Sequence, residues 1–83
     1  MGFIKGVIFM TFGERLVFAL DIRGMQQKEL AEMSGLTEVT ISRYITGSRE
    51  PKADNIIKIC KALCISSDWL LGLKDNVKRK MKR

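Results

Sequence analysis

The feature that most constrains this chain is a pair of short helical segments separated by a three-residue turn. Residues 27–33 and 38–46 carry apolar side chains at helical spacing, and residues 34–36 lie between them. Ala31 stands four residues before Gly35, where a small side chain lets the two helices lie close together. Gly35 can take the positive φ that such a turn needs. The pattern predicts two rigidly packed helices, with the outer face of the second one exposed.

Capping signals and apolar spacing predict three further helices around this pair. Thr11 and Glu14 match the capping box that opens a helix, and Gly24 ends that helix. Ser66 is a good N-cap for a short helix near the end of the domain. No alternating strand pattern follows residue 11, so the predicted fold class is all-α, with one domain over residues 11–73. The five predicted helices span residues 12–23, 27–33, 38–46, 54–63 and 67–71.

Length and composition limit the chain to one small domain and exclude most chemistry. Its 83 residues are 46% hydrophobic and 29% charged, which is typical of a globular chain. There is no His, no phosphate-binding GxxxxGK[ST] loop and no catalytic triad. Cys60 and Cys64 lie on one helix face, but no further Cys or His completes a metal site. We therefore expect no enzyme, no metal, no cofactor and a reducing cytoplasm as the compartment.

The first ten residues form an apolar arm that differs from the domain after it. Its β-branched and aromatic side chains favour a strand, which would have to pair with another chain or pack on the helices. Alternatively, translation begins at Met10, one residue before the capping box. The arm is too short to span a bilayer, and no signal-peptide cleavage site follows it. We expect no membrane association.

The last ten residues form a strongly basic tail. Residues 74–83 hold six basic side chains and one acidic side chain, which accounts for +5 of the formal net charge of +6. Such a tail suits an anionic polymer such as a nucleic acid, and the plainer alternative is a solvated tail that aids solubility.

The second helix of the central pair has an outer face suited to the edges of base pairs. A helical wheel turns Ile41 and Tyr44 inward and leaves the opposite face exposed. Arg43 can donate two hydrogen bonds to guanine, Glu38 can accept one from cytosine, and Val39 can contact a thymine methyl group. Two simpler alternatives are a solvated charge at Arg43 and a favourable helix-terminal charge at Glu38. The candidate base-reading residues are Thr37, Glu38, Val39 and Arg43.

A second group of polar residues is placed to hold the DNA backbone. Gln27 begins the first helix of the pair, where amide groups favour a phosphate. Arg49 and Lys52 flank Pro51 in the loop that follows the second helix. The candidate backbone-contacting residues are Gln27, Ser42, Thr46, Arg49 and Lys52.

From residue 12 to residue 72, the sequence resembles the phage repressor and Cro-like helix-turn-helix domains. The matching segments are GERL at 13–16, QKELAEMSGLTEVTISRYITG at 27–47, Pro51, and KALCISSDWLLG at 61–72. The resemblance implies a five-helix domain that binds specific sequences of double-stranded DNA. Bound near a promoter, such a regulator blocks the polymerase or recruits it, and of the two we expect a repressor. The resemblance also implies a homodimer on a palindromic operator. An alternative is a protein-interaction module of the same fold, such as an antitoxin or antirepressor partner, that reads no bases. The chain shows no sensor domain, so we expect no small-molecule ligand.

Five positions depart from the family pattern. The Arg and Glu that often pair between the first and third helices are Leu20 and Ile45 here, so an apolar contact replaces an ion pair. Gln26 and Lys52 stand where Ser, Thr or Asn usually caps a helix, and Cys64 replaces a common Gly. We expect the domain to form, with weaker capping at the second and fourth helices.

Overall fold

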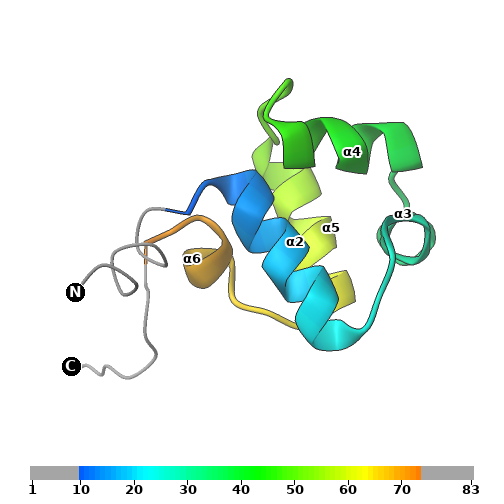
Figure 1. The fold of residues 1–83 in the computed structure, drawn as a ribbon, viewed down its shortest axis with the longest axis horizontal. Helices are drawn as coiled ribbons and strands as arrows, with labels where there is room; N and C mark the ends of the chain where they lie inside the picture. The colour runs from blue at the N-terminus through cyan, green and yellow to red at the C-terminus, as the bar shows by residue number, and fades with distance from the viewer. Residues whose placement is uncertain (1–9, 74–83) are drawn as a thin grey trace.

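The computed structural model describes residues 10–73, which fold into five α-helices with no strand among them (Figure 1). The predicted all-α class and the order of the helices are therefore confirmed. Two predicted segments lie outside the described residues. They are the arm of residues 1–10, of which only Met10 is described, and the basic tail of residues 74–83. The helices are α2 (Phe12–Arg23), α3 (Gln27–Ser34), α4 (Glu38–Thr46), α5 (Ala53–Leu63) and α6 (Ser67–Leu70).

The predicted helix bounds differ from the observed ones by one residue in three places. Helix α5 begins at Ala53, because Lys52 has the extended backbone of an N-cap. Helix α3 continues to Ser34, and α6 ends at Leu70. These differences do not move the turn between α3 and α4. Gly35 ends α3 and takes a positive φ, as predicted.

One apolar core joins all five helices. Helix α2 packs against α4, α5 and α6, and α3 packs against α4 and α5. Figure 1 shows α2 and α5 at the centre, α4 across one end, and α3 and α6 on opposite sides. Every helix contributes at least one side chain that is fully withdrawn from solvent, which explains how such short helices are stable. These residues are Leu16, Leu30, Ile41, Ile59, Leu63 and Leu70.

Side-chain caps fix the starts of the helices to different degrees. At α2 the full capping box is present: the backbone N–H of Glu14 donates to the Thr11 hydroxyl, and that of Thr11 donates to the Glu14 carboxylate. At α3 the backbone N–H of Gln26 donates to Glu29 Oε1 at 2.8 Å. The side chain of Lys52 makes no cap hydrogen bond at α5. The side-chain cap is thus missing at α5, as expected, whereas Glu29 supports the start of α3.

The positions where the family often has an ion pair belong to the apolar core. Leu20 is buried, and the half-buried Ile45 packs against the same core. Cys64, which stands at the common Gly position, ends α5 with a left-handed backbone at φ 56°. The carbonyl groups at this helix end accept hydrogen bonds from Arg23, whose Nε donates to Leu63 O at 2.7 Å and whose Nη2 donates to Cys64 O at 3.0 Å.

Arg15 is a buried charge to which the sequence analysis assigned no role. Only 1% of its surface is exposed, and its Nη1 donates a hydrogen bond to the backbone carbonyl of Trp69 at 3.1 Å. The guanidinium carbon lies 5.2 Å from the centre of the Trp69 ring, within the range of a cation–π contact. Gly72 lies beside it: a Cβ atom there would make an ordinary contact of 3.5 Å with Arg15 Nε, so the φ of +83°, and not lack of space, favours glycine at this position. Arg15 therefore ties α6 to α2.

Helices α2 and α4 approach each other closely at Gly13. A Cβ atom at this position would collide with the backbone carbonyl of Ile45 at the end of α4. Because the obstacle is backbone, it cannot turn aside as a flexible side chain would. Gly13 is therefore required for the packing of α2 against α4.

We predict that Gly13→Ala lowers the free energy of unfolding by about 2–3 kcal/mol, because the added methyl group forces the two helices apart. Urea denaturation followed by circular dichroism measures this change. Gly35→Ala is the matched control: its φ is +82° and no atom lies within 4 Å of the added carbon. It reports backbone strain alone, about 1 kcal/mol. Equal decreases in the free energy of unfolding for Gly13→Ala and Gly35→Ala would contradict the close approach of α2 and α4 at Gly13.

Candidate nucleic-acid interface

The turn between α3 and α4 satisfies its own polar groups and holds the two helices together. The backbone N–H of Gly35 donates to Ala31 O at 3.0 Å, with Gly35 in the left-handed region. The buried Ser34 hydroxyl donates to the same carbonyl at 3.4 Å and accepts from the backbone N–H of Leu36 at 3.3 Å. In Figure 1, α3 is seen nearly end-on while α4 is seen from the side, so the two helices cross steeply. The predicted helix-turn-helix is therefore present.

The inner face of α4 is fixed by apolar packing and by one buried hydroxyl group. Ile41 and Tyr44 are buried, as the helical wheel predicted. The Tyr44 ring meets Phe12 of α2 edge-to-face, with ring centres 6.3 Å apart. Its hydroxyl oxygen accepts a hydrogen bond of 2.7 Å from Asn55 Nδ2 of α5. Tyr44 thus joins α4 to both α2 and α5, which limits how far α4 can rotate or slide.

The N-terminus of α4 is capped by Thr37. The Thr37 hydroxyl accepts a hydrogen bond from the backbone N–H of Thr40 at 3.1 Å and donates one to the Thr40 hydroxyl at 2.8 Å. Its single proton is therefore already used, and only its acceptor capacity remains. Thr37 is exposed, so its hydroxyl can still accept a hydrogen bond from outside the protein.

Five of the nine candidate DNA-contacting residues line one open hollow on the outer face of α4. Its volume is ≈ 320 Å³, and it extends from α4 to the first residue of α3. Arg43 and Glu38 are exposed, and Val39 is 59% exposed, as the helical wheel predicted. Gln27 and Ser42 are half-buried. A cation, an anion, an amide, a hydroxyl and an apolar surface therefore face one space. The five residues are Gln27, Glu38, Val39, Ser42 and Arg43.

The other four candidates are exposed but lie outside this hollow. Thr46 and Arg49 line a second hollow of ≈ 230 Å³, between the start of α2 and the loop after α4. The Thr46 hydroxyl donates to the Arg43 carbonyl at 3.2 Å, so it strengthens the end of α4. Thr37 and Lys52 line neither of these two hollows. The structure thus brings seven of the nine residues into two hollows on α4 and its flanking segments.

Two residues that support this surface were missed by the sequence analysis. Asn55 holds the Tyr44 hydroxyl across 11 residues of sequence, and Gly13 lets α2 reach the end of α4. Neither residue has a local signal for these roles, because both depend on packing between helices. Within residues 10–73, no cluster of three potential metal ligands occurs, and no helix is long and apolar enough to cross a membrane.

Known proteins whose sequences are similar to this chain include transcriptional regulators. The profile of the Helix-turn-helix family matches residues 19–70. The HTH-type transcriptional regulator ImmR of Bacillus subtilis strain 168 is 37% identical over 71 residues, which cover 86% of this chain and 55% of ImmR. The prophage-derived regulator YonR of the same organism is 33% identical over 60 residues, covering 72% of this chain and 56% of YonR. The chain therefore spans about half the length of these relatives.

Solved structures share the same arrangement of helices. The P22 c2 repressor in complex with a synthetic operator has a TM-score of 0.70 and 32% identity, covering 75% of this chain and 94% of that one. The restriction-modification controller protein C.AhdI from Aeromonas hydrophila has a TM-score of 0.70 and 33% identity, covering 72% of this chain and 91% of that one.

We predict that Thr37→Ala lowers the free energy of unfolding by about 1 kcal/mol, because the backbone N–H of Thr40 loses its acceptor. Thr37→Ser keeps a hydroxyl group and should stay within about 0.5 kcal/mol of the original chain. Val39→Ala, at an exposed position of the same helical turn, is a control for a change that leaves the cap intact. Thermal denaturation of the four proteins measures these effects. A Thr37→Ala variant as stable as Val39→Ala would contradict the capping role.

Proposed function

Because this chain belongs to the helix-turn-helix family of transcriptional regulators and is homologous to phage repressors, we propose that it binds specific sequences of double-stranded DNA and represses transcription. The observation that carries the proposal is the outer face of α4. Glu38, Val39 and Arg43 are exposed there, differ in hydrogen-bonding character and line one hollow. The inner face of α4 packs against α2 and α3 and is hydrogen-bonded to α5. A helix held in this way can enter the major groove as one rigid element.

In the proposed complex, the first part of α4 reads base edges. The Arg43 guanidinium would donate to O6 and N7 of a guanine. Glu38 would accept from N4 of a cytosine, and Val39 would contact a thymine methyl group. Thr37 would contribute as an acceptor, because its proton is held by Thr40. Support for these roles is the exposure of all four side chains and the hollow shared by Glu38, Val39 and Arg43.

The proposed backbone contacts surround these base contacts. Gln27 would place the N-terminus of α3 against a phosphate, where helix N–H groups favour negative charge. Arg49 and Lys52, in the loop before α5, would contact the backbone of the DNA strand that lies on the other side of α4. The hydroxyl groups of Ser42 and Thr46 would contact phosphates from α4 itself. Support for a footprint that spans one groove is their placement: Gln27 and Ser42 line the first hollow, and Thr46 and Arg49 line the second.

The proposed active form is a homodimer on a palindromic operator. Two copies would place their α4 helices in successive major grooves, about 34 Å apart. The support is the likeness to the P22 c2 repressor, which was solved in complex with an operator. Occupancy of such a site in the cytoplasm would block access of the polymerase to a promoter. This function needs binding alone, without a catalytic step, cofactor or small-molecule ligand.

The basic tail of residues 74–83 has a separate proposed role. Six positive side chains would neutralise phosphates regardless of the base sequence. The tail would therefore add affinity for any duplex and make binding more sensitive to salt.

We predict that Arg43→Ala weakens binding to the preferred operator by about 1–3 kcal/mol and relaxes specificity at one base pair of each half-site. Lys61→Ala is the charge-matched control, since Lys61 is exposed on α5 and lines neither hollow. The affinity of Lys61→Ala for DNA should fall only because one positive charge is lost, and by the same factor for every base sequence. Titration of operators with every single base-pair change measures both effects. Unchanged discrimination at every position in Arg43→Ala would refute Arg43 as a base reader.

A further inference from the structure

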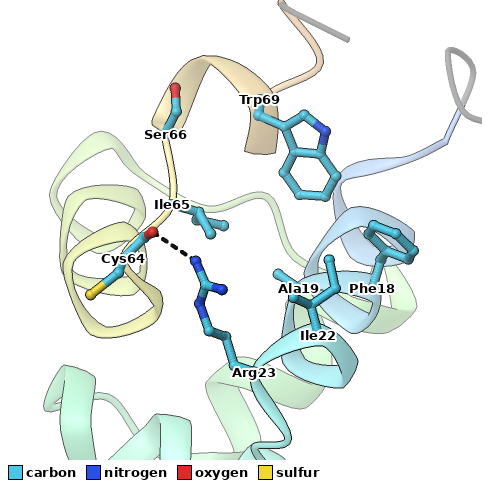
Figure 2. A pocket seen from close by; sticks show the side chains of 8 residues that line it. All are labelled: Phe18, Ala19, Ile22, Arg23, Cys64, Ile65, Ser66 and Trp69. Atoms are coloured by element: carbon cyan, nitrogen blue, oxygen red, sulfur yellow. Dashed lines mark hydrogen bonds between the residues drawn. The ribbon is translucent and has the colours of Figure 1, made fainter. Parts of the chain in front are cut away.

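An apolar groove lies on a part of the domain that the proposed DNA contacts do not use. It has a volume of ≈ 330 Å³ and runs between the second half of α2 and the connection from α5 to α6. Phe18 and Ile22 form one wall, and Ile65 and Trp69 form the other (Figure 2). None of its lining residues belongs to α3 or α4.

One wall of this groove exposes two large apolar side chains, and the other wall is half-buried. Phe18 is 47% exposed and Ile22 is 57% exposed, one helical turn apart on α2. The Trp69 ring is half-buried, with its centre 5.9 Å from that of Phe18. Arg23, at the end of the groove, already donates hydrogen bonds to the carbonyls of Leu63 and Cys64. The surface left for an occupant is therefore mostly apolar, and such a surface marks a contact site.

The same chain carries an apolar segment of suitable length directly before α2 in the sequence. Residues 1–9 contain six large apolar side chains and one charged side chain, Lys5. They lead through Met10 directly into α2, whose N-cap is Thr11. The α2 residues from Phe12 to Ile22 rise by about 15 Å, because an α-helix advances 1.5 Å per residue. Nine residues in an extended conformation reach about 30 Å, so they can return along the whole of α2.

We propose that residues 1–9 fold back along α2 and occupy the groove between Phe18, Ile22 and Trp69. This contact buries two apolar surfaces of the same chain, the side chains of residues 1–9 and the walls of the groove. A second copy of the chain would cover the groove but leave its own arm exposed. The direct covalent link also favours the arm, because a short tether gives an effective concentration in the millimolar range. Since the groove contains no residue of α3 or α4, the docked arm leaves the proposed DNA surface free.

Trp69 reports directly on this contact, because it is the single Trp of the chain. We compare the full chain with a variant that begins at Met10 and with the full-length double variant Phe3→Ser, Ile4→Ser. The expected result is a shift of Trp69 emission to longer wavelength and stronger quenching by acrylamide in both variants. Far-UV circular dichroism confirms that the helices remain. Equal emission and quenching in all three proteins would overturn the proposal.

A disulfide cross-link tests the position of the arm. Lys5→Cys keeps the apolar side chains of the arm and places a thiol near the exposed Cys64 at the groove. Burial raises the pKa of the Cys60 thiol, so Cys60 reacts slowly. With oxidised glutathione, we expect a disulfide within one chain between the introduced thiol and Cys64.

The groove variant and its control decide the outcome of that experiment. Adding Phe18→Ser should slow formation of the intramolecular disulfide about tenfold, because the arm then retains only its tethered effective concentration. Adding Met33→Ser should not change the rate, since Met33 is exposed on α3 outside the groove. Equal rates in the two backgrounds would overturn the proposal. So would cross-linking mainly between chains, with Trp69 protection that is lost on dilution, because a second copy would then fill the groove.

Discussion

The burial of one face of α4 is the constraint on which the rest of this structure depends. Helix α4 has nine residues, too few for an isolated helix to be stable in water. Its stability comes from the packing of its buried face, which includes Ile41 and Tyr44, against α2 and α3. The close approach at Gly13 and the hydrogen bond from Asn55 to Tyr44 serve this packing from two sides. The opposite face of α4, which carries Glu38, Val39 and Arg43, is exposed.

This arrangement links the stability of the domain to its proposed function. Recognition of a base pair depends on hydrogen bonds whose geometry tolerates only small displacements. A helix fixed by a glycine contact, a buried hydroxyl and an N-cap presents Arg43 and Glu38 in a defined register. The apolar groove lies on α2 and α6, where contact with another segment would not disturb α4. The fold thus separates a polar outer surface on α4 from an apolar surface elsewhere.

The sequence predicted the features that depend on neighbouring residues and missed those that depend on distant ones. The capping box at Thr11, the turn at Gly35 and the inward face of Tyr44 follow from local spacing, and the structure confirms them. The burial of Arg15 against Trp69 joins residues 54 positions apart, and no local pattern indicates it. The roles assigned to the residues on α4 stay predictions, because exposure in a shared hollow shows access and not a bound base.

The most direct test of the account is selection of binding sites from a random duplex pool with the full-length protein at about 150 mM salt, near physiological ionic strength. We expect an enriched palindrome whose half-sites are separated by about one helical turn, because two α4 helices would enter successive major grooves. Recovery of no enriched sequence, with only weak and salt-sensitive retention of all duplexes, would contradict this expectation. The outer face of α4 would then not read bases, and the basic tail alone would account for contact with DNA.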